Sequence, residues 1–271
     1  MSPLVTVLTP TWNRAHTLPA LKESLEAQTS RDFEWLVVDD GSTDSTAALL
    51  ASWEGRTDFP FRYMRTENGG KHRALNRGVP EARGEAIFIV DSDDRLPPRA
   101  VALIAAAWPE ARADASLAGL VGYRASGRGL RMGPEFPAGL RQASSLDLAW
   151  HHGMRADKAE VFKASVLRDF PFPEIEGESF LTEAVVWNRI AKSQGLLLVR
   201  EILYSCDYLA DGLSAKSLEL RLRNPRGARL YYDELMRAEV PMAARLRARI
   251  NRARIAVLAA AAHPRGKGIG V

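Results

Sequence analysis

Three carboxylates directly follow an apolar run at residues 86–90, which reads Ala-Ile-Phe-Ile-Val. Such a run is typical of a strand that is buried on both faces of a parallel sheet. Asp91 and Asp93 are two positions apart, so in an extended chain their side chains project to the same side. A close pair of carboxylates suits a divalent cation that also holds phosphate. The alternative is that Asp91, Asp93 and Asp94 cap a helix beginning near residues 97–98, and this stretch alone leaves both interpretations open.

Two further strands must end beside these carboxylates. Residues 4–8 and 33–38 are rich in β-branched and aromatic side chains, and a polar cluster follows each of them. Segments with helical spacing of apolar residues lie between the strands. This alternation predicts an α/β fold with a doubly wound, mostly parallel central sheet flanked by helices. Because the carboxyl ends of parallel strands share one edge, the clusters at residues 9–14, 39–42 and 91–94 would converge on a single crevice.

Composition and missing motifs argue against several classes of protein. The chain has 271 residues, of which 46% are hydrophobic and 26% charged, as in an ordinary globular protein. Neither a Gly-x-Gly-x-x-Gly motif nor a Walker loop follows the first strand, which disfavours dinucleotide and P-loop enzymes. The single cysteine, Cys206, rules out an internal disulfide. No apolar stretch is long enough to span a bilayer and the start lacks signal-peptide features, so we expect a cytoplasmic protein.

Charge is distributed unevenly along the chain. Residues 216–271 hold 13 Lys and Arg against 4 Asp and Glu, a net charge of +9; the whole chain carries +4, which leaves −5 for residues 1–215. We therefore expect a basic helical C-terminal extension over residues 216–271, and no nucleic-acid partner for the acidic body. Within the extension Leu246, Ile250, Ala253 and Val257 form an apolar stripe flanked by arginines. This helix either packs on the domain with a solvated basic face or docks on anionic lipid at the inner face of the cell membrane.

Several of these clusters, in this order and spacing, resemble family 2 glycosyltransferases with the GT-A fold. The resemblance rests on four segments of the first hundred residues: Thr-Pro-Thr-Trp-Asn-Arg at 9–14, Val-Val-Asp-Asp-Gly-Ser-Thr-Asp at 37–44, Asn-Gly-Gly-Lys at 68–71 and Val-Asp-Ser-Asp-Asp at 90–94. Weaker matches lie at residues 177–183 and 211–214. The resemblance implies a GT-A domain over residues 1–215, with a nucleotide-binding half at about 1–95 and an acceptor half at about 96–215.

The same resemblance implies an activity. Members of the family transfer a sugar with inversion from a nucleotide diphosphate donor, commonly UDP-linked, with the help of Mn²⁺ or Mg²⁺. We expect the acceptor to be a hydroxyl of a saccharide or of a lipid-linked glycan. Two alternatives stay open: a catalytically weak or inactive relative that binds a nucleotide sugar, and a sugar nucleotidyltransferase that uses the same carboxylate pair.

The resemblance also assigns site residues. Asp93 would bind the metal directly, and Asp91 would lie beside the ribose or the hydration shell of the metal. Asp40 would hydrogen-bond the base; the alternative is that it builds a turn. The full set of expected nucleotide contacts is Thr9, Pro10, Thr11, Asn13, Arg14, Asp40, Gly70, Lys71, Arg73, Asp91 and Ser92.

Elementary electrostatics supports part of this set. A diphosphate leaving group develops negative charge, which a cation bound by Asp91 and Asp93 would neutralise. Lys71 and Arg73 could add positive contacts to the phosphates. The alternative for both is a solvated first helical turn, although cations there oppose the helix dipole.

The sequence offers two candidates for the general base. An inverting transferase needs a carboxylate that takes the proton of the acceptor hydroxyl. In the family this base often belongs to a Glu-Asp pair at a helix start, whereas this chain has Glu183 followed by Ala184. Glu183 is the first candidate, because it opens an apolar helix, and Glu178 is the second. The alternative for each is an acidic helix start that the dipole favours.

Overall fold

The computed structural model of the chain describes residues 2–206 and 217–262. Among these residues the strands are β1 Val5–Thr11, β2 Phe33–Asp39, β3 Phe61–Arg65, β4 Ala86–Ile89, β5 Leu117–Ser126, β6 Gln142–Ala143, β7 Lys158–Lys163 and β8 Gly195–Cys206. The helices are α1 Leu18–Glu26, α2 Thr46–Trp53, α3 Lys71–Glu81, α4 Ala100–Ala113, α5 Ser145–Trp150, α6 Ala164–Asp169, α7 Ala184–Ile190, α8 Ser217–Arg223, α9 Pro225–Arg237 and α10 Met242–Ala262. The weak match at residues 211–214 and the domain boundary expected at residue 215 lie outside the described residues.

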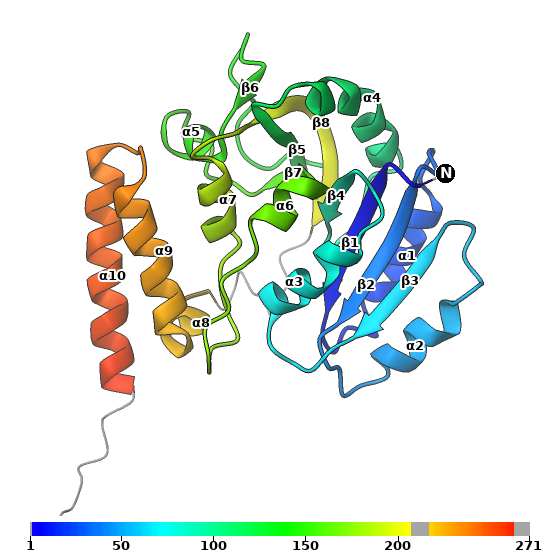
Figure 1. The fold of residues 1–271 in the computed structure, drawn as a ribbon, viewed down its shortest axis with the longest axis horizontal. Helices are drawn as coiled ribbons and strands as arrows, with labels where there is room; N and C mark the ends of the chain where they lie inside the picture. The colour runs from blue at the N-terminus through cyan, green and yellow to red at the C-terminus, as the bar shows by residue number, and fades with distance from the viewer. Residues whose placement is uncertain (1, 207–216, 263–271) are drawn as a thin grey trace, which may run out of the picture.

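One central sheet runs through the body of the molecule in the order β3-β2-β1-β4-β7-β5-β8-β6 (Figure 1). The first four strands in this order pair in parallel, as the βαβ alternation predicts. Strand β7 is antiparallel to both of its neighbours, β4 and β5, and β5 then pairs in parallel with β8. The predicted α/β fold with a mostly parallel sheet is confirmed, with two reversed strands, β7 at its centre and β6 at its edge.

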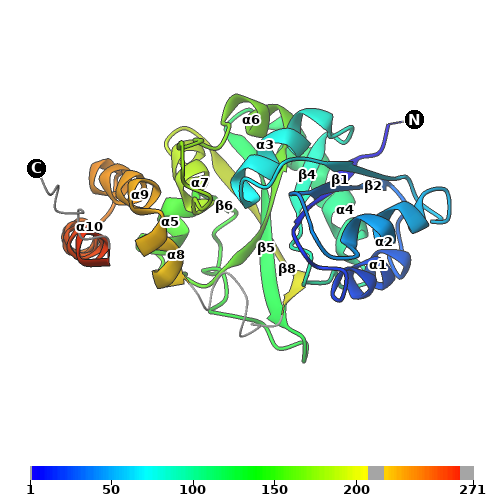
Figure 2. The same cartoon turned by 90° about the horizontal axis from the view of Figure 1, so that it is seen from below.

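Helices cover both faces of the sheet, with α3 and α6 on one side and α1, α2 and α4 on the other (Figure 2). The predicted helical spacing in α1 is real, since Leu18, Leu21 and Leu25 are completely buried. They belong to a core that also takes in side chains of α2 and α4, whereas α3, α6 and α7 contribute to a second core on the opposite face. Burial of both sheet faces explains why the strands read as continuous apolar runs.

Strand register brings the polar clusters to one edge. Thr11 at the end of β1 is paired with Asp39 at the end of β2, and β1 also pairs in parallel with β4. The amide of Asp40 donates to the carbonyl of Thr11 over 2.8 Å. The amide of Asn13 donates to the hydroxyl of Ser42, also over 2.8 Å. The predicted convergence of the strand ends is therefore present in the structure.

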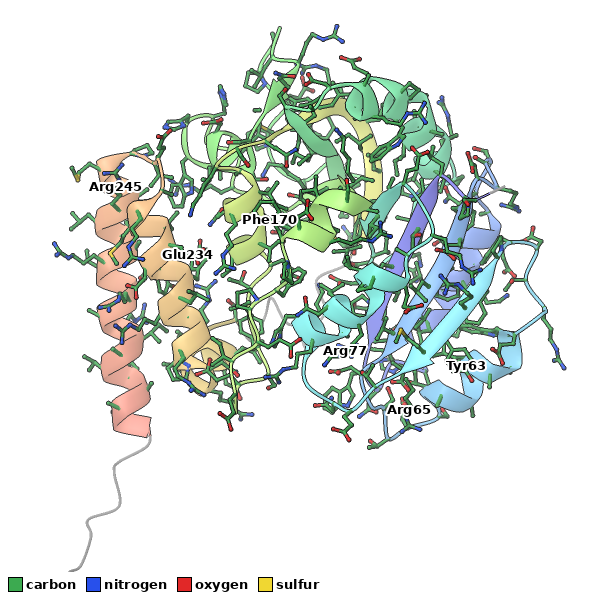
Figure 3. The ribbon with its side chains drawn as sticks, viewed as in Figure 1. Tyr63, Arg65, Arg77, Phe170, Glu234 and Arg245 are labelled. Atoms are coloured by element: carbon green, nitrogen blue, oxygen red, sulfur yellow. The ribbon has the colours of Figure 1, made fainter. Side chains whose placement is uncertain are left out.

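The predicted C-terminal helices are also present. Helix α9 lies between α10 and the rest of the molecule, and a four-residue connection makes α9 and α10 neighbours (Figure 1). Tyr232 and Leu235 of α9 form a third apolar cluster with side chains of α10 and of α5. Glu234 of α9, labelled in Figure 3, pairs with the guanidinium of Arg189 on α7 at 2.6 Å. Of the helices described, none combines the length and apolarity needed to cross a membrane.

Candidate active site

A cavity of about 440 Å³ opens where the strand ends converge. It receives side chains from the ends of β1, β2 and β4, from the start of α3, from the segment before α7, and from α8. Its wall consists of Pro10, Thr11, Trp12, Arg14, Asp40, Asn68, Gly70, Lys71, His72, Asp91, Ser92, Asp93, Asp94, Arg124, Asp157, Ser179, Phe180, Leu181, Glu183, Cys206, Leu220 and Arg223. Most of the residues predicted from sequence therefore lie around one volume.

The aspartates after β4 crowd negative charge at the floor of this cavity. Burial, followed by repulsion from Asp91, raises the pKa of Asp93 above its ordinary value. Burial and the same neighbour raise the pKa of Asp94 to about 7. A bound cation would relieve this repulsion. Asp91 and Asp93 are partly exposed to the cavity, with side-chain exposures of 31% and 20%.

A tyrosine from the other half of the sheet holds residues 91–94, the aspartate loop, in place. The amide of Asp91 donates to the hydroxyl of Tyr204 on β8 over 2.9 Å. The same hydroxyl donates to a carboxylate oxygen of Asp94 over 2.6 Å. Asp94 is therefore a positioning group with little access to the cavity, while Asp91 and Asp93 face it. Sequence reasoning missed the role of Tyr204, because 110 residues separate the two partners.

Lys71 links the aspartate loop to the segment before α7. Its ammonium nitrogen lies 2.5 Å from Oδ1 of Asp91 and 2.5 Å from Oε1 of Glu183. Burial by itself lowers the pKa of the Lys71 ammonium, but the two carboxylates outweigh burial and raise this pKa well above its ordinary value. Burial raises the pKa of Asp91, and the Lys71 charge overcomes it, so that the net pKa is lowered. Lys71 is therefore a fixed positive charge between the first aspartate and Glu183, inside the cavity.

Asp40 lines the cavity and also builds the turn before α3. Its Oδ1 accepts from the amide of Gly69 over 2.9 Å, and its Oδ2 accepts from the amide of Gly70 over 2.7 Å. Burial raises the pKa of Asp40 despite these two amide hydrogen bonds. Gly70 is required here, because its φ is +97° and a Cβ would lie 1.8 Å from the carbonyl oxygen of Ser179. Asp40 therefore builds the turn before α3, and it also lies in the wall of the cavity.

Three predicted nucleotide contacts do not reach the cavity wall. The hydroxyl of Thr9 is buried and accepts from the indole N–H of Trp35 over 3.0 Å. Oδ1 of Asn13 accepts from the amides of Thr43 and Asp44, which ties the turn after β1 to the start of α2. Arg73 donates to the carbonyl of Ile175 over 2.8 Å and pairs with a carboxylate at residue 174. These side chains shape the loops that carry the wall.

Glu178, the second candidate for the base, lies outside the cavity wall. Its two carboxylate oxygens accept from the amides of Arg226 and Gly227, over 2.8 and 2.7 Å, at the first turn of α9. The side chain is buried, with a residue exposure of 5%, and it is absent from the cavity wall. Amides at a helix start are natural partners of a carboxylate. Glu178 therefore anchors α9, and the structure does not bring it to a position where it could act as the base.

Several wall residues have no signal in the sequence. The guanidinium of Arg124, from β5, stacks 4.0 Å from the ring of Tyr204 and donates to the carbonyl of Lys158. Two buried polar atoms of the wall have no hydrogen-bond partner within the described chain: Nδ1 of His72, and Oγ1 of Thr11, which is one of the nucleotide contacts expected from the sequence. Buried polar atoms normally have partners, so such orphans are positions where a ligand can be accepted.

The chemistry of this donor set fits a divalent cation that shares its coordination with phosphate. Among the described residues no group of three or more His, Cys, Asp and Glu side chains is arranged to hold a metal ion by itself. Mg²⁺ and similar ions are often held by one or two carboxylates, with the remaining ligands supplied by phosphates and water. Asp93 and Asp91 offer that pair within one cavity.

Comparison with known proteins connects this geometry to a family. The family model described as "Glycosyl transferase family 2" matches residues 6–170. The "Glycosyltransferase GlyG" of Streptococcus pneumoniae serotype 4 is 39% identical over 95 residues, which cover 35% of this chain and 31% of that protein. The matched segment thus spans about a third of this curated relative.

Solved structures match nearly the whole chain. S. aureus TarS 1-349 in complex with UDP-GlcNAc superposes with a TM-score of 0.63 at 19% identity, over 95% of this chain and 72% of that one. The mannosyltransferase PcManGT from Pyrobaculum calidifontis, in complex with GDP-Man and Mn²⁺, gives a TM-score of 0.62 at 23% identity, over 100% and 77%. At these identities the likeness concerns the fold alone, and it confirms the expected GT-A architecture with its helical C-terminal region.

Proposed function

This chain belongs to glycosyl transferase family 2, and we propose that it transfers a sugar with inversion from a nucleotide diphosphate donor, UDP-linked, to a hydroxyl of a saccharide or a lipid-linked glycan. The observation that carries the proposal is the arrangement inside one cavity of Asp91 and Asp93, the Lys71 ammonium, and Glu183. This arrangement provides the charges needed for a diphosphate leaving group, together with a carboxylate for the acceptor hydroxyl.

The donor is assigned to the side of the cavity formed by the strand ends. Thr11 carries an orphan hydroxyl, and Asp40, Pro10 and Gly70 line the same wall. The carboxylate of Asp40 keeps lone pairs beyond the two that accept the loop amides, which suits the N–H of a uracil. Arg14, whose guanidinium lies 4.0 Å from Asp93, suits a phosphate oxygen.

The metal is assigned to Asp93, with Asp91 beside it. When bound there, Mn²⁺ or Mg²⁺ would neutralise the charge that develops on the departing diphosphate. Lys71 contributes a second positive charge on the same side, fixed by its contact with Asp91. PcManGT, which shares this fold, was solved in complex with GDP-Man and Mn²⁺, and this supports a divalent cation beside the donor.

Glu183 is the proposed base. Its carboxylate is 31% exposed within the cavity and paired with the Lys71 ammonium. In the reaction the acceptor oxygen forms a bond to the anomeric carbon while the bond from that carbon to the diphosphate oxygen breaks. Glu183 takes the acceptor proton, and the nucleoside diphosphate leaves with the bonding electrons. Attack from the face opposite the leaving group inverts the anomeric centre.

We also propose limits for the two halves of the domain and a location in the cell. We assign donor binding to about residues 1–95 and acceptor binding to about 96–215, because the ends of β2 and β4 supply Asp40, Asp91 and Asp93 while the segment before α7 supplies Glu183. A nucleotide-sugar donor and the lone Cys206 agree with a cytoplasmic location, with peripheral contact at the inner face of the membrane.

The test is release of nucleoside diphosphate from a panel of UDP- and GDP-sugars, with Mn²⁺, with Mg²⁺ and with a chelator. We expect turnover with at least one donor and its loss on chelation. Asp93→Asn should lower turnover at saturating donor by at least about 100-fold, while Asp169→Asn, a matched change at the exposed end of α6, should leave it unchanged. Binding without turnover would identify an inactive relative, and pyrophosphate chemistry would identify a nucleotidyltransferase.

A further inference from the structure

Helix α10 presents an uncovered apolar stripe. Met242, Leu246, Ile250 and Val257 expose 75, 56, 57 and 68% of their surface. Together with Leu258 they make up five of the eight large apolar residues that are exposed in the described chain; the others are Trp12, Leu130 and Leu218. Isolated exposed apolar residues are ordinary, but a contiguous row on one helix marks a contact surface.

The opposite face of α10 is already used. Ala244, Ala248 and Ile255 are 2–4% exposed and belong to the apolar cluster shared with α9. Arg252 pairs with Asp233 of α9 at 2.5 Å. Figures 1 and 2 both place α10 at the outer edge of the molecule, with α9 on its inner side. The exposed stripe therefore faces away from the body of the protein.

Arginines border this stripe on both sides. At 3.6 residues per turn, Arg245 and Arg249 lie along one edge of the stripe and Arg247 and Arg254 along the other. All four are exposed, and Arg245 is labelled at one end of α10 in Figure 3. No Asp or Glu occurs anywhere in Met242–Ala262. An apolar stripe between two rows of cations matches the layering of a lipid surface, where acyl chains lie beneath anionic headgroups.

We propose that the outer face of α10 docks on a membrane surface that contains anionic phospholipid, with the apolar stripe in the acyl boundary and the arginines on the headgroup phosphates. Charge complementarity selects this occupant. In a symmetric pairing of two copies, each stripe would meet its own image, and the bordering arginines would face arginines with no carboxylate on the helix to separate them. This docking is independent of the transferase chemistry proposed above, because no residue of α10 lies in the cavity wall.

The test is co-sedimentation of the whole chain with vesicles of phosphatidylcholine alone and with vesicles in which about a third of the lipid is phosphatidylglycerol. We expect binding to the anionic vesicles only, weakening as salt is raised. Leu246→Ser combined with Ile250→Ser should lower the partition coefficient at least about tenfold. Arg245→Gln combined with Arg249→Gln should also lower the partition coefficient, by about fivefold for each arginine that is replaced.

Matched controls are Leu130→Ser and Arg56→Gln, which change an exposed apolar residue and an exposed cation elsewhere. Both should partition like the unchanged chain, and every variant should keep its melting temperature and its donor turnover. The proposal is overturned if the unchanged chain stays in solution with anionic vesicles, or if the α10 variants bind as well as the controls. It is equally overturned if sedimentation velocity shows a dimer that the Leu246→Ser and Ile250→Ser changes dissociate.

Discussion

Lys71 holds together two carboxylates whose proposed roles differ. Asp91 belongs to the metal side of the cavity and Glu183 to the acceptor side, yet both lie 2.5 Å from one ammonium nitrogen. Lys71 keeps its charge, because the two carboxylates overcome the effect of burial on its pKa. A permanent cation here lets Glu183 stay close to the aspartates without direct repulsion between carboxylates. A substitution at Glu183 removes the proposed base and leaves the Lys71 ammonium and Asp91 in place, so it tests the role of the base by itself.

We predict that Glu183→Gln lowers kcat by about 10²- to 10⁴-fold and leaves donor affinity nearly unchanged, since the amide cannot accept the acceptor proton. Nucleoside diphosphate release gives kcat, and calorimetric titration with the donor gives affinity. Glu176→Gln is the matched control, because that exposed carboxylate lies seven residues away in the same segment. Full activity of Glu183→Gln would remove Glu183 from the mechanism.

At the scale of elements, the segment before α7 and the start of α9 hold one another. The side-chain oxygen of Asn224 accepts from the amides of Ser179 and Phe180, over 2.8 and 3.1 Å. In return Glu178 accepts from the two amides at the start of α9. Ser179 and Phe180 are part of the cavity wall. Helix α9 therefore helps to set the shape of the cavity, although its own side chains stay outside it.

We predict that Glu178→Gln lowers the free energy of unfolding by about 1–3 kcal/mol, because the buried carboxylate loses its charge and one of its two acceptors. The kcat of the folded enzyme should stay within about threefold of the original, in contrast to Glu183→Gln. Urea unfolding measures the first quantity and diphosphate release the second. Loss of turnover at unchanged stability would instead restore Glu178 as a candidate base.

At the scale of the whole molecule, the site draws on both ends of the chain. Asp40 and the aspartate loop come from the first four strands, Tyr204 comes from β8, and Leu220 and Arg223 come from α8. The third apolar cluster joins α9 and α10 to Leu146 of α5. A separate extension would leave the cavity intact on removal, whereas these contacts make α8 and α9 part of its construction.

We therefore predict that a chain ending at residue 215 loses both stability and turnover, because Glu178 and the cavity wall lose their partners and the cluster around Leu146 is exposed. A chain ending at residue 240 is the control: it keeps α8 and α9 and should retain turnover with a lower melting temperature. Thermal unfolding measures the stability of each chain, and release of nucleoside diphosphate measures its turnover. Undiminished turnover of the shorter chain would establish residue 215 as a true domain boundary.

The amino-acid sequence alone was enough to predict the alternation of strands and helices, the convergence of residues 9–14, 39–42 and 91–94, and the apolar stripe on α10. These features follow from local periodicity, since alternating strands and helices place consecutive strand ends on one edge and 3.6 residues per turn sorts a helix into faces. The resemblance to family 2 glycosyltransferases brought Lys71 and Glu183 forward as candidates, and both line the cavity.

Which carboxylate meets which partner depends on the tertiary packing. Glu178 and Glu183 look alike in sequence, but one faces the amides of α9 and the other faces Lys71. Tyr204 and Arg124 gave no signal, and strand β7 enters the sheet in the opposite direction. The physical reason is that these contacts join residues tens to more than a hundred positions apart, so their geometry depends on how packed layers meet and not on any spacing along the chain.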